Sequence, residues 1–512
     1  MRPLSPTLLL VTLAWQAASG QEVRIDRVTA DIAFLSSPEF NGRAATEPGG
    51  DLAARFVAAE FRKAGLKPFD GKGYLQEFAL TRATLDEAAS SVTLVREGVR
   101  DVLQPATGFD GGFKVDVQVS GGLVFVGYGI TAPEYGYDDY AGVDARGKVV
   151  LLFSREPQED DPKSVFRGAA LSLYAAQRAK VLNAQAHGAA AVLVLPAVRF
   201  KAPPRNPSAA RGWAATLYDD ALRIPMLTLT SGVAARVLPN HRELQERIDQ
   251  TGRPASAEIA GKVDIKLVQK ERRAGKTYNV IGVVEGTDAR LKSEAVIVSG
   301  HYDHLPNRGE YIYPGANDNG SGAAAVIEMA RLAREQKVKP KRTLVFIAFG
   351  AEENGLLGAY QYAERPAVPL KDTRAVLNLD MIARDEAHIP ATEGRLEIPA
   401  DTSALLNLSG GAWSPDLAAS VRRAAGRFGL RIDPKYDQDA SQGVLWRSDH
   451  FPFLLRGVPA VWIFAGFHPG YHESTESIEK LNLDKLEKTI RFTWQLALEL
   501  ADASKPPAFQ AK

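Results

Sequence analysis

The chain has 512 residues, of which 45% are hydrophobic, so it is long enough for two or more domains with cores of their own. Its 62 Lys and Arg residues nearly balance 61 Asp and Glu residues, and the formal net charge is +1. A charge this close to zero argues against nucleic acid or an anionic membrane surface as the partner. The sequence has no cysteine, which excludes disulfides and leaves His, Asp and Glu as the candidate metal ligands.

The first twenty residues have the pattern of a secretory signal peptide. Arg2 is followed by an apolar run over residues 8–15 and by small residues at 18–20, so we expect cleavage after Gly20. The apolar run is much shorter than the ~20 residues that a membrane-spanning helix needs, which argues against a membrane anchor. The sequence therefore predicts an exported protein, either periplasmic or secreted.

Residues 21–114 are predicted to form the N-terminal part of the main domain. Residues 51–64 have the apolar spacing of an amphipathic helix, which Gly65 ends. Residues 81–115 carry only weak strand signals, and we expect them to form a joint to the next segment.

From about residue 115 the pattern changes to β-strands, because runs of Val, Leu and Ile alternate with Gly, Asp and Pro turns. The order YGYDDYAGVDARGKVVLL, then a helix over about 169–187, then HGAAAVLVL resembles the protease-associated domain, a β-rich module inserted in exopeptidases. The resemblance implies a lid or recognition domain over residues 115–265 with no chemistry of its own. By themselves, Asp138 and Asp139 indicate a turn rather than a pair of ligands.

Residues 266–505 are predicted to form an α/β domain, because short apolar strands alternate with helices. The expected strands are 279–284, 295–299, 343–349, 375–379 and 460–464, and the expected helices are 321–335, 355–363, 415–428 and 483–500. Buried strands separated by helices of this length predict a mostly parallel, doubly wound sheet with helices on both faces. Such a sheet binds ligands beyond the carboxyl ends of its strands.

Acids and histidines follow several of these strands. The stretches that carry them are SGHYDHL and GANDNGSG after strand 295–299, AEENG after strand 343–349, NLDMI at the end of strand 375–379, and GYHE after strand 460–464. Asp380 lies among apolar residues, where a carboxylate is costly unless it is paired or bound to a metal. His187, His241 and His388 lie outside these stretches, and we assign them structural roles.

The residue types at these strand ends suit a pair of metal ions. Two divalent ions about 3.5–4 Å apart can be held by two histidines and three carboxylates, with one carboxylate shared. Zinc accepts such ligands and lowers the pKa of bound water to about 7, and a nearby carboxylate that is not a ligand can accept the proton. The residues that match the ligand count are His301, Asp318, Glu353, Asp380 and His472, with Glu352 as the spare acid.

The motifs SGHYDHL, GANDNGSG, FGAEENGLLGA, NLDMI, RSDHFPF and GYHE, in this order, resemble the M28 family of zinc aminopeptidases, in particular secreted members with a protease-associated domain. The resemblance implies two zinc ions bridged by Asp318, with Glu352 as the general base. It implies that His301 and His472 each bind one end of the metal pair. It also implies that Asp318 and the two histidines hold one zinc and that Asp318, Glu353 and Asp380 hold the other. Asp303 would orient a ligand, the role of such partners in zinc sites generally.

Two further positions match residues that hydrogen-bond the oxyanion in similar enzymes, namely Tyr471 and Arg447. In the same motif as Arg447, Asp449 and His450 are expected to fix the loop. One position departs from the family pattern, because Glu476 stands where the family often has aspartate. This departure concerns the hydrogen bonding of the loop and not the metal ligands.

The resemblance implies an exported two-zinc metallopeptidase that uses a metal-bound hydroxide to remove the N-terminal residue of peptides with a free amino end. Relatives in the superfamily include carboxypeptidases and a one-zinc glutaminyl cyclase, so these activities remain alternatives. The same architecture also occurs in binding proteins that have lost the zinc ligands. All five ligands and Glu352 are present in this sequence, which argues against a non-catalytic protein.

Overall fold

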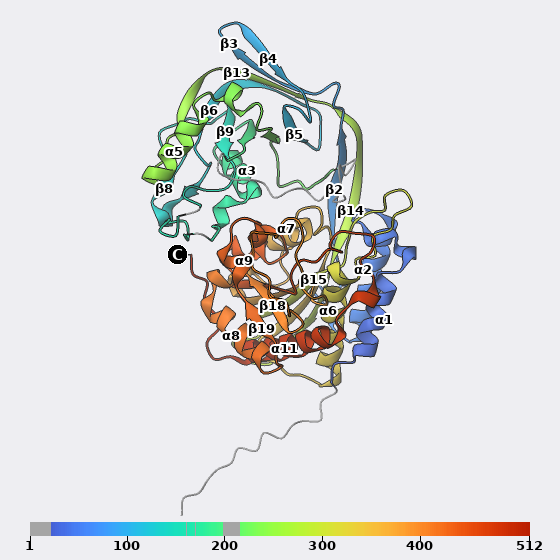
Figure 1. Cartoon of the computed structure of the whole chain (residues 1–512). Helices are drawn as coiled ribbons and strands as arrows, with labels where there is room; N and C mark the ends of the chain where they lie inside the picture. Colours follow the sequence, from blue (N-terminus) through green and yellow to red (C-terminus); the bar gives the residue numbers. More distant parts are fainter. Residues whose placement is uncertain (1–21, 160, 169, 198–215, 512) are drawn as a thin grey trace, which may run out of the picture.

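The computed structural model of the chain describes residues 22–511, apart from residues 160, 169 and 198–215. The predicted signal peptide, residues 1–20, lies outside the described residues. Among the helices of the described residues, none combines the length and the apolar character needed to cross a membrane. The described chain forms two large sheets, one in a main domain and one in an inserted segment (Figure 1).

The main domain is built on a ten-stranded sheet that is parallel at its centre. In spatial order the parallel strands are β16 (Thr343–Phe349), β15 (Ala295–His301), β17 (Thr373–Leu379) and β20 (Ala460–Phe464). The outer strands are β1 (Lys67–Pro68), β2 (Leu75–Leu85), β11 (Thr216–Tyr218) and β14 (Gln269–Val284) beyond β16, and β18 (Leu405–Ser409) and β19 (Arg431–Asp433) beyond β20. The predicted α/β fold class is confirmed. The sheet is less parallel than predicted, because the outer pairs are antiparallel, apart from the parallel pair of β18 and β19.

Helices cover both faces of this sheet, as the sequence predicts. The helices that share one core are α1 (Ile25–Leu35), α2 (Pro48–Lys63), α6 (Gly322–Glu335), α8 (Pro415–Gly426) and α11 (Leu483–Asp502), and those in the opposite core are α7 (Leu357–Glu364) and α10 (Phe451–Leu454). Along β15, Val296 and Val298 belong to the first core, whereas Ala295 and Ile297 belong to the second. Alternate side chains of a strand point to opposite faces, so β15 is apolar throughout because both of its faces are buried.

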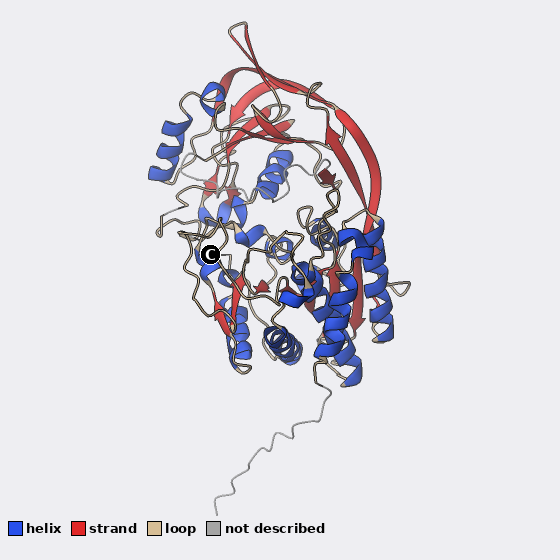
Figure 2. Ribbon diagram, turned by 45° about the vertical axis from the view of Figure 1, so that its right-hand side comes forward, coloured by secondary structure: helices blue, strands red, loops and turns tan. Residues whose placement is uncertain are grey.

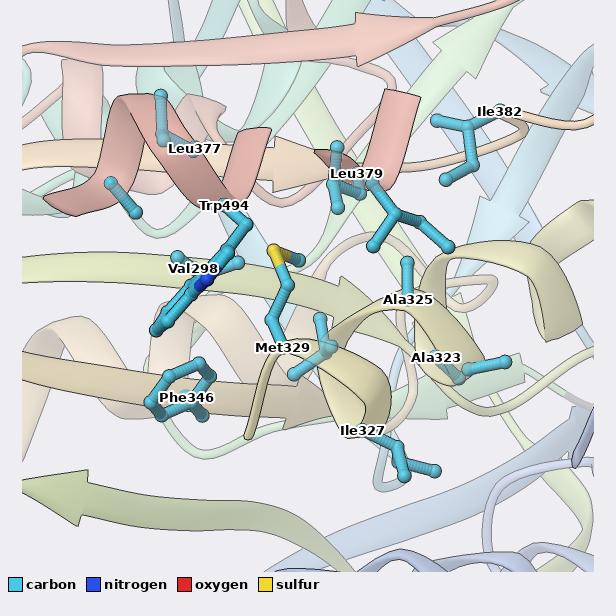
Figure 3. Close-up of a cluster of buried hydrophobic side chains, with 14 of the residues drawn as sticks. Val298, Ala323, Ala325, Ile327, Met329, Phe346, Leu377, Leu379, Ile382 and Trp494 are labelled. Carbon is cyan, nitrogen blue, oxygen red and sulfur yellow. The ribbon is translucent and has the colours of Figure 1, made fainter. Parts of the chain in front are cut away.

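The first of these cores fixes the strands that carry the site. Figure 3 shows Val298 of β15, Phe346 of β16 and Leu377 of β17 beside Met329 of α6 and Trp494 of α11, and all five are buried. Because each of the three strands is anchored in this way, their carboxyl ends are held at one edge of the sheet.

The inserted segment forms an eight-stranded sheet with its own apolar core. Its strands in spatial order are β4 (Val99–Leu103), β3 (Ser91–Arg96), β13 (Ala257–Leu267), β6 (Val117–Phe125), β9 (Val149–Phe153), β10 (Ala191–Leu195), β12 (Met226–Leu229) and β5 (Phe109–Gly112). Its helices are α3 (Gln177–Ala186), α4 (Ala234–Val237) and α5 (His241–Thr251). Asp139 is buried beside it and accepts hydrogen bonds from the backbone N–H groups of Tyr128 and Ile130, a structural role.

The insertion is longer than the sequence predicts. Strands β3, β4 and β5 precede the predicted boundary at residue 115, yet they pair within the second sheet. Between β2 and β14 the chain builds the second sheet, and it returns to the first sheet in the short edge strand β11, which pairs with β2. We define the insertion as residues 86–268, and β2 and β14 form the long ribbon that joins the two parts (Figure 2). The sequence does not predict this ribbon, because the first half of β14 is exposed and carries charged residues on both faces.

The helix predicted over about 169–187 is shorter in the structure, where α3 begins at Gln177. The preceding residues Leu171, Ala175 and Ala176 pack instead into the second core of the main domain. Arginines of the insertion add polar contacts, since Arg167 donates to the carbonyl of Ala412 at 2.7 Å. These tertiary contacts override the helical pattern and fix the insertion against the main domain.

Candidate metal centre

The residues predicted to form the site lie at the carboxyl ends of the central strands or in the loops that follow. His301 is the last residue of β15, Asp380 directly follows β17, and Glu353 lies four residues beyond the end of β16. Asp318 lies in a short π-helical turn, η4 (Ala316–Ser321), directly before α6, and His472 lies in the loop after β20. The parallel order of β16, β15, β17 and β20 brings these ends to one edge, where open α/β sheets bind their ligands.

The five predicted ligands form two groups that share Asp318. His301 Nε2 lies 3.5 Å from Asp318 Oδ1 and 3.3 Å from Asp380 Oδ1. On the other side, His472 Nε2 lies 3.1 Å from Asp318 Oδ2 and 3.2 Å from Glu353 Oε2. Each oxygen of Asp318 therefore faces a different histidine, which is the arrangement of a bridging carboxylate.

In the structure each side of Asp318 has one histidine and one further acid. This geometry agrees with His301 and His472 at opposite ends of a metal pair, and it differs from the implied assignment of both histidines to one zinc. The reason is strand order, because β15 and β17 are neighbours and bring His301 to Asp380.

The donor atoms of these groups suit metal ions. His301 Nε2 and Asp380 Oδ1 are buried and have no hydrogen-bond partner among the described residues. Buried polar atoms without partners are costly, and a divalent ion would satisfy them. Two clusters of possible ligands occur among the described residues, one with His301, Asp318 and Asp380 and one with His304, Asp318 and Glu353. Nitrogen and oxygen donors in this number fit zinc.

His304 is a residue of this site that sequence reasoning missed. Its buried Nδ1 lies 2.7 Å from Glu353 Oε1, so Glu353 has a histidine near each of its oxygens. The signal was present in the motif SGHYDHL, three residues after His301. The five other ligands already suffice for two metal ions, so the sequence alone assigns no role to His304.

Glu352 and Glu353 are adjacent in sequence but have different surroundings. Glu352 Oε2 lies 3.8 Å from His301 Nε2, outside both groups. Burial raises the pKa of Glu352 well above its usual range, although His301 acts in the opposite direction. Burial would also raise the pKa of Glu353, but the neighbouring His472 and His304 overcome it and hold that pKa well below its usual range.

Asp303 holds the loop that carries the two glutamates. Its carboxylate accepts hydrogen bonds from the backbone N–H groups of Glu352 at 3.1 Å and of Glu353 at 3.4 Å. Its backbone carbonyl lies 3.1 Å from His301 Nδ1, whereas its carboxylate is 3.9 Å from that nitrogen. Asp303 is thus placed to orient His301 through its main chain and the glutamates through its side chain.

Other hydrogen bonds fix the two remaining acids. The Ser448 hydroxyl donates to Asp380 Oδ2 at 2.6 Å. The backbone N–H of Asp318 donates to Glu476 Oε2 at 3.2 Å, so the glutamate at the position where the family often has aspartate still contacts the loop. Asp449, which we expected to fix its loop, is buried, but neither of its carboxylate oxygens has a hydrogen-bond partner in the described part of the chain.

The predicted oxyanion residues lie together at the side of His472. A guanidinium N–H of Arg447 donates to the Tyr471 hydroxyl at 3.1 Å, and the Tyr471 ring stacks on His472 with ring centroids 3.9 Å apart. The side chain of His472 is 24% exposed, whereas that of His301 is 1% exposed. The open side of the site is therefore the side on which Arg447 and Tyr471 lie.

Two of the histidines that we assigned structural roles lie in the insertion. The His187 ring stacks on Tyr140 with centroids 4.0 Å apart, and His241 Nδ1 lies 2.9 Å from the carbonyl of Leu238. The third, His388, is exposed.

The chain is similar to known peptidases. Residues 279–497 match the family model described as Peptidase family M28. Aminopeptidase YwaD of Bacillus subtilis (strain 168) is 27% identical over 392 residues, which cover 74% of this chain and 69% of the relative. The probable lipoprotein aminopeptidase LpqL of Mycobacterium tuberculosis (strain ATCC 25618 / H37Rv) is 28% identical over 245 residues, which cover 44% of this chain and 45% of LpqL.

A solved structure has the same fold over nearly the whole chain. The aminopeptidase from Aneurinibacillus sp. strain AM-1 aligns with a TM-score of 0.52 and 22% sequence identity, covering 96% of both chains. At this identity the likeness concerns the fold alone, and it includes the insertion as well as the main domain.

Proposed function

We propose, from the match of residues 279–497 to peptidase family M28, that the chain is a zinc-dependent aminopeptidase that removes the N-terminal residue of peptides. The observation that carries the proposal is the position of Asp318, with one carboxylate oxygen toward His301 and the other toward His472. Two similar proteins are named as aminopeptidases, which supports this activity over the other activities of the superfamily.

We propose that the site holds two zinc ions. His301 and Asp380 would hold one, His472 and Glu353 the other, and Asp318 would bridge them. When bound, zinc supplies Lewis acidity, which polarises a carbonyl group and makes water a stronger acid near neutral pH. The two unpartnered atoms, His301 Nε2 and Asp380 Oδ1, support the first of these positions.

Glu352 is the residue that we propose as the general base. It lies beside the ligand groups without belonging to them, so its carboxylate is free to accept a proton from the attacking water and to return it to the leaving amine. A raised pKa suits a group that must both accept and donate a proton near neutral pH. Arg447 and Tyr471, on the open side, would stabilise negative charge that develops on the carbonyl oxygen.

We further propose that the first twenty residues direct export and are then cleaved off. We also propose that the substrates are peptides with a free amino end. The sequence pattern of residues 1–20 supports export. The similar proteins named as aminopeptidases support peptides with a free amino end as the substrates.

Zinc analysis combined with turnover of an aminoacyl anilide tests the proposal. We expect roughly two zinc ions per chain, loss of activity on chelation and recovery on addition of zinc. The matched control is the same anilide with an acetylated amine, which should be a poor substrate if the free amine is recognised. Efficient cleavage of the blocked anilide would contradict the aminopeptidase assignment and leave the metal site intact.

A further inference from the structure

A cavity of about 700 Å³ lies between the insertion and the main domain. Its volume falls in the range of ligand pockets, roughly 300–1,000 Å³. Insertion residues line one wall and main-domain residues line the other, so the cavity exists only because the two parts are packed together.

The insertion wall is built at the carboxyl ends of three parallel strands. β9, β10 and β12 are neighbours in this order and run parallel, and the residues that follow or end them, Ser154, Pro196 and Thr230 among them, line the cavity. Open sheets bind ligands beyond the carboxyl ends of parallel strands. The insertion thus presents its binding edge to the main domain.

The wall formed by the main domain continues from the loops of the metal site. Leu356 lines the cavity, and its backbone N–H donates to the carbonyl of Glu352 at 2.8 Å. Trp446 also lines the cavity and directly precedes Arg447 in the chain. Phe451, at the start of α10, completes this apolar surface. The loop of Glu352 and the loop of Arg447 therefore each reach the cavity within four residues of these side chains.

The chemistry of the cavity favours apolar groups over charged ones. Arg178 stacks on Tyr360 at 4.1 Å from the ring centroid, and its charge is paired with Asp219 at 2.5 Å. Arg155 is paired with Glu159 in the same way, at 2.5 Å. The two arginine charges are therefore matched, and Asp110 and several hydroxyl groups also line the cavity. Its aromatic and aliphatic surface, formed by Leu356, Tyr360, Trp446 and Phe451, is the part that can pack against an apolar ligand group.

We propose that this cavity is the subsite for the peptide chain that follows the scissile bond, and that it favours apolar or aromatic side chains there. A peptide supplies side chains that can pack on the surface formed by Leu356, Tyr360, Trp446 and Phe451. The inference rests on the proposed aminopeptidase function. It gives the insertion a direct part in substrate choice.

The test compares two substrates of the zinc-loaded protein. One is leucyl-p-nitroanilide, which has no peptide beyond the scissile bond, and the other is a leucyl tetrapeptide with phenylalanine at positions two to four. The variant Gln177→Trp fills the cavity from the exposed start of α3, far from the ligands in sequence, and Ser231→Trp does so from the turn after β12. Gln250→Trp, at an exposed position of α5 outside the cavity lining, is the matched control.

We expect Gln177→Trp and Ser231→Trp to lower kcat/KM for the tetrapeptide by about tenfold or more, the effect of losing apolar contacts in a substrate pocket. The loss should lie mainly in KM, and turnover of the anilide should stay within about twofold of wild type. Gln250→Trp should change neither. Equal effects on both substrates, or no effect of either variant on the tetrapeptide, would overturn the subsite. A wild-type protein that binds zinc but cleaves neither substrate would instead overturn the aminopeptidase proposal on which it rests.

Discussion

Buried acids follow parallel strands in both sheets, yet their surroundings differ. Asp380 follows β17 of the main domain, and its Oδ1 has no hydrogen-bond partner in the described chain but lies 3.3 Å from His301. Glu156 follows β9 of the insertion, and Ser172 donates to both of its oxygens through its backbone N–H, at 3.1 and 3.0 Å, and through its hydroxyl to Oε2. The same topology thus yields a candidate ligand where the acid is left unsatisfied beside a histidine, and a structural acid where the acid is satisfied.

The comparison also separates the two edges by charge. At the main-domain edge, four acids, Asp318, Glu352, Glu353 and Asp380, gather around His301, His304 and His472. Such an arrangement is stable only with cations or protons between the acids. At the insertion edge, Arg155 and Arg178 are paired with acids one by one. We therefore expect loss of an acid to remove metal from the first edge and to leave metal content unchanged at the second.

The largest effect is expected for Asp318→Ala. The substitution removes a donor from both groups and the negative charge that reduces repulsion between the two ions, so both ions should be lost and activity with them. His472→Ala is the matched variant, because His472 contacts only the group that contains Glu353, and it should retain one ion. Metal content per chain, measured on both variants, checks this, and an Asp318 variant that keeps both ions would contradict the bridging role.

A smaller effect, on rate and not on metal, is expected for Glu352→Gln. The amide has nearly the same shape but cannot accept a proton, and loss of a general base typically lowers the rate by ~10² to 10⁴, equivalent to roughly 3 to 5 kcal/mol. Zinc content and KM should change little, because the ground state does not use this proton transfer. Single-turnover kinetics combined with zinc analysis makes the measurement.

Glu353→Gln serves as the control for that prediction, because Glu353 contacts His472 and His304. It should weaken metal binding, since a neutral amide replaces an anionic ligand. If the Glu352 variant lost zinc and the Glu353 variant kept it with a slow chemical step, the two roles would be reversed.

The sequence was sufficient for the edge that carries the ligands. The strands at β15, β16 and β17 are apolar on both faces, and this signal places His301, Glu353 and Asp380 at or just beyond the carboxyl ends of buried strands. It was not sufficient for the partition of the ligands, because that depends on β15 lying beside β17, a long-range pairing that periodicity does not encode. His304 was missed for a related reason, since its contact with Glu353 joins two separate loops.

The insertion was less predictable than the main domain. β4 has exposed residues on both faces, so it lacks the alternation that marks a half-buried strand, and the boundary was placed too late. Helix α3 begins at Gln177, later than the predicted start near residue 169, because Leu171 and Ala175 are not in this helix and pack on the main domain instead. Both differences arise from contacts between segments far apart in the chain.

The smallest effect, on stability alone, is expected for Glu156→Gln in the insertion. Burial raises the pKa of Glu156 from 4.5 to about 8, although the hydrogen bonds from Ser172 act in the opposite direction. The folded protein therefore keeps a proton that the unfolded chain releases, so the free energy of unfolding should fall as the pH rises from about 4.5 to about 8. Glutamine stays neutral and retains an oxygen acceptor for Ser172, so the variant should lose less stability over this range.

Thermal unfolding of both proteins between about pH 5 and pH 9 measures the difference in stability, which should grow with pH and level off above the folded pKa. Glu258→Gln, which changes a largely exposed acid of the same insertion, is the control and should follow the wild-type curve. Parallel curves for wild type and Glu156→Gln would show that the acid is already ionised in the folded protein, and would remove the contrast drawn between the two edges.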